Sequence, residues 1–523
     1  MQQRVRRMPR RKINTKRLPA EASSEHDHLP PGGGEKSGQP YCNPFLLFQP
    51  MQANGPLIPF NPQQTRDRKL PKILYGVLDQ AEVADDGSAW LMFGTVEGQW
   101  LQTQLTQGGV IPSDPAASTQ FFRSMPLYLL EIRLSAPEVL AVGGPDGSSF
   151  SSLGPASGRP VGQTLIDLER RWVRIDLEAG GRDADLYENL FGPVNQVAVG
   201  SIRPASQDEG LFLDSLDPLR NDPDATEKEI EDALSAVSQV DEVAVYDVGQ
   251  GGANGLVSAK EVVCYFDFGG GVAGNTPTFP AALTTFCQCR KPPIILSHWD
   301  HDHWSSEGRD TRVHSQTWIV PRQTSHGTKK APHHSALVKA IQSAHGTILV
   351  WPSTVSTKRI GQLEIGQCKG SSKNDSGLSL EIHPPSGISA RPVLMLADAG
   401  YGDLAVYRGS GSYDAIVCPH HGGRSNSPKI PSPPSAGTYQ RLIYTYGFNN
   451  TYKHPLPKTY TDHDTAFWTD QRVTAAPANY IVRNTADRNA RTQLGHVGFD
   501  WTAGTSLTAL VCAAGSDLDP QQK

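Results

Sequence analysis

The sequence of 523 residues predicts an α/β fold that is preceded by a β-rich region and an irregular tail. Beyond residue 242, short β-branched runs recur between helical or loop segments, which is typical of sheets covered by helices. Between residues 71 and 235, strand-like runs alternate with Gly, Pro and Asp turns. We therefore expect a tail over residues 1–70, a β-rich accessory domain over 71–235 and an α/β domain over 236–515.

The tail combines a cluster of arginine and lysine residues with a stretch rich in Pro, Gly, Ser and Glu. This composition buries too little apolar surface to offset the entropy of ordering, so it predicts disorder. The basic cluster is compatible with contacts to phosphates or a partner, with an organellar transit peptide, or with simple solvation.

Strands are expected where β-branched and aromatic residues form short runs between turn residues. In the β-rich region these runs are 73–78, 127–132 and 172–177; in the α/β region they are 243–246, 262–266, 294–296, 347–350, 393–396, 415–417 and 442–446. Apolar residues at helical spacing predict an amphipathic helix over 224–240, where the two regions join, and a crossover helix over 335–344.

The bulk composition narrows the class of protein. The net charge of -5 does not by itself indicate a nucleic-acid partner, and the odd number of scattered cysteines (7) argues against a disulfide framework. No stretch approaches the roughly 20 consecutive apolar residues that a membrane span requires. The first 20 residues are rich in arginine and lack the apolar core of a secretory signal, so a cytoplasmic protein is expected.

Residues 297–304 read Ser-His-Trp-Asp-His-Asp-His-Trp and contain four candidate metal ligands: His298, Asp300, Asp302 and His303. The run follows Pro-Pro-Ile-Ile-Leu, a buried-strand pattern, which places it at the carboxyl end of a strand, where open α/β sheets bind ligands. Because side chains alternate along an extended chain, the first pair is expected to face one cation and the second pair its neighbour. The alternative is an ordinary surface loop that is rich in histidine.

Further motifs accompany this run in a fixed order. They are Val-Tyr-Asp-Val-Gly-Gln-Gly (245–251), Tyr-Phe-Asp-Phe-Gly (265–269), Asn-Asp-Ser-Gly-Leu-Ser-Leu (374–380) followed by Leu-Met-Leu-Ala-Asp (394–398), Val-Cys-Pro-His-His-Gly-Gly (417–423) and Asn-Asn-Thr-Tyr-Lys-His-Pro (449–455). In this order and spacing, residues 242 to about 500 resemble the metallo-β-lactamase fold superfamily. Within it they are most similar to the branch typified by the hydrolase domain of the competence protein ComEC.

The resemblance implies an αββα sandwich that binds two divalent cations. It assigns His298, Asp300 and His421 to the first cation, Asp302 and His303 to the second, and Asp398 to a bridging position. His420 is the implied general acid or phosphate-binding group, and Asp302 also counts as catalytic. His454 and Asn450 are expected either to reach the leaving group or to form a structural turn beside Pro455. Zinc is the first choice of metal, with manganese as the alternative because Asp300 makes the site harder.

This sequence departs from the superfamily pattern at three places. Asp300 replaces the usual second histidine, Ala397 replaces a glycine, and no histidine of the third motif is evident between His303 and Asp398. The histidines in that gap are expected at the surface or in local hydrogen bonds: His326, His333, His334, His345 and His383. Asp247 is expected to hold its loop by hydrogen bonds, while Gly249 and Gly251 supply turn geometry and Trp299 and Trp304 pack.

The function expected from these motifs is a metal-dependent phosphodiesterase, a nuclease or nucleotide hydrolase, that uses a dinuclear metal-activated hydroxide. Its partners would be DNA, RNA or a nucleotide, with no membrane and with a protein partner as an option for the 71–235 region. Two alternatives stay open: a lactone, thioester or β-lactam hydrolase on the same fold, and a non-catalytic, metal-stabilised interaction protein. The sequence does not choose the substrate, the pathway or the oligomeric state.

Overall fold

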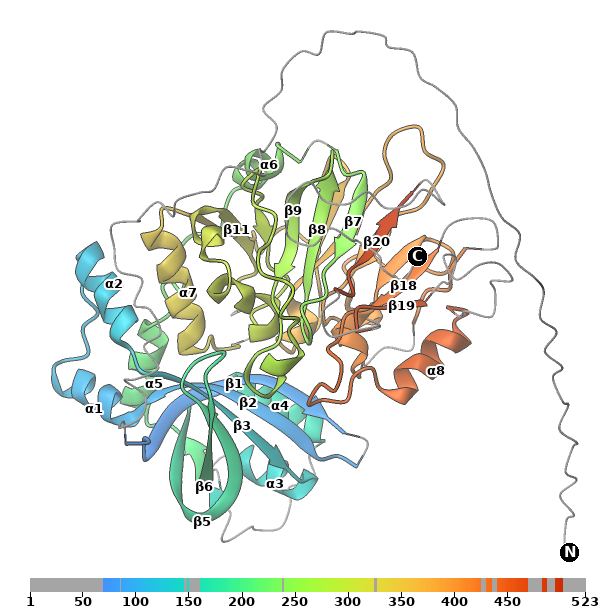
Figure 1. The fold of residues 1–523 in the computed structure, drawn as a ribbon. Helices are drawn as coiled ribbons and strands as arrows, with labels where there is room; N and C mark the ends of the chain where they lie inside the picture. Colours follow the sequence, from blue (N-terminus) through green and yellow to red (C-terminus); the bar gives the residue numbers. More distant parts are fainter. Residues whose placement is uncertain are drawn as a thin grey trace, which may run out of the picture. The chain divides into compact units, whose positions relative to one another are not determined.

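The structure is a computed structural model, and the part of the chain that it describes contains three β-sheets (Figure 1). It describes residues 69–501 except 85, 145–147, 150–159, 238, 324–326, 425–428, 435–439, 469–481 and 487–493, and omits the side chains of 148–149. The predicted α/β class is confirmed. The predicted tail lies outside the described residues apart from its last two positions, as does His326.

The first sheet has six antiparallel strands and belongs to the region predicted to be β-rich. Its order is β1 (Ile73–Val83), β2 (Ala89–Glu97), β3 (Leu127–Leu134), β5 (Val173–Tyr187), β6 (Val194–Pro204) and β4 (Ser148–Ser149). Strand β5 pairs with both β3 and β1, so the sheet curls back on itself. The helices of this region are α1 (Gly98–Thr106), α2 (Pro115–Ser124), α3 (Ala136–Val142), α4 (Val161–Glu169) and α5 (Gln207–Ser215).

A bulge interrupts β1 at Asp79. Leu78 pairs with Phe93 and Gln80 with Met92, so Asp79 is an extra residue between two paired positions. A bulge re-aims the side chains of its strand, because side chains otherwise alternate between the two faces. As a result, the neighbours Asp79 and Gln80 both reach the candidate site described below.

The other two sheets have seven strands each. One has the order β12 (Thr347–Val350), β11 (Thr317–Val320), β10 (Ile294–Ile295), β9 (Glu261–Phe268), β8 (Ala253–Ser258), β7 (Glu242–Val245) and β20 (Val497–Asp500). The second has the order β13 (Thr357–Ile360), β14 (Leu363–Gln367), β15 (Leu378–Ile382), β16 (Val393–Met395), β17 (Ala415–Val417), β18 (Arg441–Tyr444) and β19 (Val482–Asn484). Every strand predicted from a β-branched run lies within or overlaps one of the observed strands.

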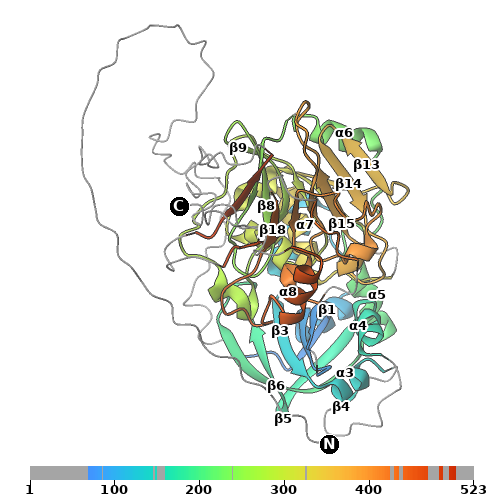
Figure 2. The same ribbon diagram turned by 90° about the vertical axis from the view of Figure 1, so that its right-hand side faces the viewer.

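The two seven-stranded sheets face each other across one apolar core (Figure 2). Phe266 and Ile319 of the first sheet and Leu380 and Ile443 of the second belong to this core, as does Ile230 of α6 (Glu227–Leu234). Helix α7 (Pro332–Ser343) packs on the other side of the first sheet, and α8 (Pro457–Thr465) contacts Tyr444 on the other side of the second. Helix α6 is shorter than the predicted 224–240, and it begins at a capping box formed by Thr226 and Glu229.

Parallel strand pairs lie at the centre of both seven-stranded sheets. Strands β9, β10 and β11 run parallel, and so do β16, β17 and β18. The loops that leave the carboxyl ends of β10, β16 and β17 carry the candidate ligands of residues 297–304, 398 and 420–421. Among the described helices, none is both long enough and apolar enough to cross a bilayer.

Candidate metal centre

Asp302, His303, His421 and Asp398 converge on one point from three separate loops. The Nε2 atom of His421 lies 3.2 Å from Nε2 of His303 and 3.4 Å from both Asp302 Oδ2 and Asp398 Oδ1. The Nε2 atom of His303 lies 3.0 Å from Asp398 Oδ1. A tetrahedral zinc ion with bonds of about 2.0–2.2 Å keeps its ligand atoms roughly 3.3–3.5 Å apart. Two overlapping groups have all of their donor atoms within 4.8 Å of one another: Asp302, His303 and His421, and His298, His303 and Asp398. Each group is spaced so that it could hold a cation, and His303 is shared by both.

Several of these donor atoms are buried without a hydrogen-bond partner among the described residues. They are Nε2 of His298, Oδ1 of Asp302 and both carboxylate oxygens of Asp398. Buried polar atoms are nearly always satisfied, because leaving one unpaired costs free energy. Unpaired atoms that approach one another from the loops after β10 and β16 fit a site whose partner is a bound cation.

The second half of the site differs from the first. The Nε2 atom of His298 lies 3.5 Å from Asp300 Oδ2 and 3.7 Å from Asp398 Oδ2, so these three side chains surround a neighbouring position. The other oxygen of Asp300 forms a 2.8 Å ion pair with the buried ammonium of Lys373. This half offers a single imidazole and has a positive charge beside it, so we expect it to bind a cation more weakly.

The structure groups His421 differently from the predicted division of ligands between the cations. His421 groups with Asp302 and His303, not with His298 and Asp300. The physical reason is local: His420 and His421 both have left-handed backbone conformations, and Nδ1 of His421 pairs with Thr445 Oγ1 at 2.9 Å. The other ring nitrogen, Nε2, therefore points toward Asp302 and His303.

Asp267 supports the centre from behind. Its carboxylate accepts hydrogen bonds from Nδ1 of His303 at 2.9 Å and from the backbone and side chain of Ser297. A carboxylate on the far nitrogen fixes the ring of a metal-binding histidine and leaves Nε2 as the donor atom. The sequence motif at residues 265–269 contained Asp267 but gave no indication of this role.

Glycines and one alanine allow the loops to approach closely. The carbonyl of Asp302 accepts hydrogen bonds from the N–H groups of Gly252 and Gly270, and a Cβ on Gly269 would lie 1.7 Å from that oxygen. The predicted turn roles of Gly249 and Gly251 are confirmed by φ values of 72° and 136°. Ala397 also has a positive φ of 52°, a conformation that glycine adopts at less cost.

Asp247, Trp299 and Trp304 behave as predicted. The carboxylate of Asp247 accepts hydrogen bonds from the N–H groups of Gly249 and Gly495, which holds its loop. Both tryptophans are buried and belong to the apolar core beneath the first seven-stranded sheet. These side chains therefore support the candidate ligands and do not belong to the ligand set.

Glu82 of β1 links the two histidines that the sequence assigned to catalysis. Its carboxylate lies 2.6 Å from Nε2 of His420 and 3.1 Å from Nε2 of His454. His420 is 3.6 Å from Asp398 Oδ2, whereas His454 is placed behind it by Gln250 and by Asn450. The Asn450 amide donates to the carbonyl of His454 and accepts from its backbone N–H. Asn450 therefore holds the loop of His454. The contribution of β1 was not predicted.

Charge interactions outweigh burial at Glu82. Burial raises the pKa of this carboxyl, but the imidazoles of His420 and His454 lower it to about 2. Burial lowers the pKa of His420, yet the carboxylates of Glu82 and Asp398 raise it well above its usual value. In the metal-free protein, the carboxylates of Glu82 and Asp398 thus favour the protonated form of His420.

Replacing Glu82 with glutamine is expected to lower kcat by about 10- to 100-fold with the metal content unchanged. The neutral amide offers only one acceptor, so one of the two histidines loses a charge-assisted hydrogen bond of about 1.5–3 kcal/mol. Steady-state kinetics with metal analysis would measure this. Asp86→Asn, at an exposed position in the turn after β1, is the control, and an unchanged kcat in Glu82→Gln would contradict the role.

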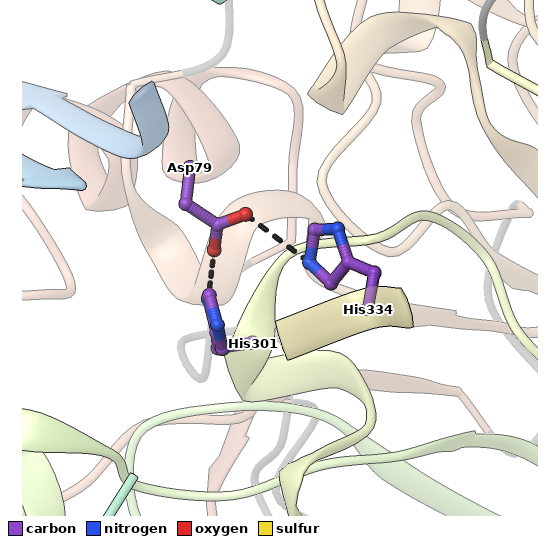
Figure 3. A group of neighbouring side chains, drawn as sticks. All are labelled: Asp79, His301 and His334. Carbon is purple, nitrogen blue, oxygen red and sulfur yellow. Dashed lines mark hydrogen bonds and ion pairs between the residues drawn. The ribbon is translucent and has the colours of Figure 1, made fainter. Parts of the chain in front are cut away.

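Asp79, His301 and His334 form a second buried cluster (Figure 3). The carboxylate of Asp79 contacts Nδ1 of His301 through one oxygen, and His334 Nε2 and Lys373 Nζ through the other, at 3.2 and 2.9 Å. Lys373 also binds Asp300, so its ammonium connects β1 with the metal-binding loop. Because an ammonium already neutralises Asp79, we interpret this cluster as a support for the centre.

The structure also shows where four of the histidines between His303 and Asp398 lie. His333 and His334 are both buried. His334 accepts a local hydrogen bond from the N–H of Ala331, which fits the prediction of a surface position or a local hydrogen bond. Neither ring nitrogen of His333 has a hydrogen-bond partner among the described residues, so the prediction is wrong for that residue. Helix α7 carries both residues against β1 and β2, which covers them. His345 is exposed and His383 pairs with Glu364, as predicted.

Glu169, at the end of α4, titrates near neutral pH in the folded protein. Burial raises its pKa from the usual 4.5 to about 7, and Asp300 and Asp375 add to this effect. Between these two pH values the folded state holds a proton that the unfolded state has lost. Stability from this group is thus fully present below pH 4.5 and is lost as the pH rises through 7.

We expect this group to lower the free energy of unfolding by up to about 3 kcal/mol between pH 4.5 and 7. Glu169→Gln removes the titrating group and should flatten that dependence, which urea unfolding of the metal-free protein at both pH values would measure. Glu178→Gln, at an exposed position, is the control. Parallel pH profiles for wild type and Glu169→Gln would show that the carboxyl titrates normally.

The chain was compared with family models and with curated proteins. No family model matches the chain, and no curated protein is similar to it. The resemblance noted in the sequence therefore stays a prediction. The structure itself shows buried histidine and aspartate groups that could hold metal ions.

Proposed function

We propose that the protein is a metal-dependent phosphodiesterase and that residues 236–515 adopt the αββα sandwich of the metallo-β-lactamase superfamily. One observation carries the proposal: Asp302, His303 and His421 present buried donor atoms at the mutual spacing of a metal-ligand set, and Asp398 lies 3.0 Å from His303 and 3.4 Å from His421. The facing sheets with α7 and α8 on their outer sides support the fold assignment.

Zinc is the proposed metal, because the ligand set mixes imidazole and carboxylate donors. A divalent cation, when bound here, supplies charge neutralisation for a phosphoryl oxygen and lowers the pKa of a water molecule. We propose a second cation at His298, Asp300 and Asp398, with lower affinity than the first. Manganese suits this harder half of the site.

His420 has the geometry of a general acid. It lies beside Asp398 and is held by Glu82, and it can give its proton to the oxygen of the leaving group. In the hydrolysis, the oxygen of water forms a bond to phosphorus and the bond between phosphorus and the leaving oxygen breaks. The leaving oxygen keeps the electron pair and takes the proton of His420, which is replaced by a proton from the attacking water. The products are a phosphomonoester and an alcohol.

The test is a substrate panel assayed with Zn²⁺ or Mn²⁺ on the purified full-length protein. It compares DNA, RNA, cyclic nucleotides and an aryl phosphodiester with a lactone, a thioester and a β-lactam. Wild type is expected to hydrolyse phosphodiesters, and Asp302→Ala and His303→Ala are expected to lose metal and activity together. Turnover of a lactone, thioester or lactam without diesterase activity would overturn the assignment, and bound metal without any hydrolysis would favour a non-catalytic role.

A further inference from the structure

A cavity of about 450 Å³ opens beside the metal centre. Asp398 and His420 line one side, and β1 and α4 of the six-stranded-sheet region line the other. The volume falls within the range of roughly 300–1,000 Å³ that is typical of small-molecule sites. A molecule that fills this cavity would touch His420 directly.

The wall opposite the metal centre is largely aliphatic. Val83 of β1 and Val161, Leu165 and Ile166 of α4 contribute to it. Gly162 lies on the same helix and leaves space beside these side chains, since a Cβ there would meet nothing within 4 Å. This wall suits the flat or apolar organic part of a ligand.

Polar groups gather at the other side of the cavity. Arg424 directly follows the His-His-Gly-Gly turn of residues 420–423, is exposed and forms no ion pair with a described residue. Asn374 lies 3.5 Å from Nε2 of His420 through its Nδ2 atom. The guanidinium and the metal centre thus approach the cavity from the same strand ends, and a guanidinium is suited to bind a phosphate.

We propose that this cavity is the substrate site and that it takes a phosphodiester of nucleotide size, not a nucleic-acid polymer. One phosphate would lie between the metal centre and Arg424, and the organic part would pack on α4. The proposal rests on the function proposed above and adds the class of substrate to it.

The charge of the lining supports a small substrate. Glu82, Glu169, Asp375 and Asp398 line the cavity, and Arg424 is the one arginine or lysine among its described lining residues. Polymer binding depends on several Lys or Arg contacts to successive phosphates. One guanidinium beside several carboxyl groups is suited to a single phosphate. Carboxyl groups can also accept hydrogen bonds from the N–H groups of a nucleobase.

The test uses full-length, zinc-loaded protein with bis(4-nitrophenyl) phosphate, cyclic AMP, cyclic GMP and a single-stranded DNA 40-mer. Two variants alter the cavity: Ile166→Trp fills it, and Arg424→Ala removes its guanidinium. Arg359→Ala is the matched control, because Arg359 is an exposed arginine on β13. We expect a higher kcat/KM for a cyclic nucleotide than for DNA. Both variants should raise KM for that nucleotide about 10-fold or more at unchanged metal content.

Preferred cleavage of the 40-mer, or cyclic-nucleotide kinetics that neither variant alters, would overturn the proposal while leaving a phosphodiesterase in place. If no diester is hydrolysed, the proposed function itself fails. Calorimetry with cyclic GMP then tests separately whether the cavity binds a nucleotide. Binding that is lost in Arg424→Ala and kept in Arg359→Ala supports a nucleotide site. Absence of binding overturns it. Circular dichroism confirms that each variant is folded.

Discussion

Replacing Asp398 with asparagine is expected to remove bound metal and to lower kcat/KM by about 10³-fold or more. Asp398 is shared by both halves of the centre: Oδ1 faces His303 and His421, and Oδ2 faces His298 and His420. The amide lacks the negative charge that two cations would share, and metal ions contribute several kcal/mol to such reactions. Plasma mass spectrometry measures the metal content. Steady-state kinetics with an aryl phosphodiester measures kcat/KM.

Two controls separate this loss from misfolding. Asp232→Asn, at an exposed position on α6, should keep full metal content and activity. Without metal, wild type and Asp398→Asn should unfold at similar urea concentrations, and only wild type should gain stability from added zinc. An Asp398→Asn protein that binds metal as wild type does would show that Asp398 is not a ligand.

Asp79→Ala is expected to lower the free energy of unfolding of the metal-free protein by about 3–5 kcal/mol. The change removes one of the two carboxylates that hold the buried ammonium of Lys373, and it takes the acceptor from His301 and His334. Breaking a buried ion pair on one side costs this much because the remaining charge stays buried. Urea unfolding monitored by tryptophan fluorescence measures the loss.

The double variant Asp79→Ala/Lys373→Met is the matched comparison. It removes both charges of the Asp79–Lys373 pair but also takes the ammonium from Asp300. The loss of stability in the double variant should therefore be smaller than the sum of the losses in the two single variants. A loss below 1 kcal/mol in Asp79→Ala would contradict the interpretation that this cluster fastens β1 to the metal-binding loop. The interpretation would also be contradicted if the double variant lost more free energy of unfolding than the two single variants lose together.

The central strands and the candidate ligands could be predicted from the sequence because their signals are local. A strand such as Val262–Phe266 is a continuous β-branched and aromatic run, and the loop after β10 carries His298 and its neighbours as a contiguous motif. Parallel strands bring Asp398 and the His420–His421 turn to the same end of their own sheet, and the packing of the two seven-stranded sheets places that end beside the loop after β10.

The contribution of the six-stranded sheet could not be predicted in this way. Asp79, Glu82 and Lys373 contact site residues that are far away in sequence, and no period or spacing encodes such contacts. In β1, three polar side chains interrupt a buried strand, and this was the one available signal. Its meaning depends on the bulge at Asp79, which only the strand pairing reveals.

The neighbours of His421 could not be predicted for a similar reason. Which half of the centre receives His421 depends on the left-handed conformation of the His420–His421 turn and on the partner of its Nδ1 atom, Thr445. Neither follows from residue types. The identity of the second-layer carboxylate, Asp267, depends on the same kind of detail.

Anomalous diffraction from crystals grown with zinc, recorded on both sides of the zinc edge, tests the central claim most directly. We predict a strong zinc peak among Nε2 of His303, Nε2 of His421 and the carboxylates of Asp302 and Asp398. A weaker peak at His298 and Asp300 would mark the second cation. No peak between the first four side chains, or zinc bound at Asp79 and His334 in its place, would contradict the account.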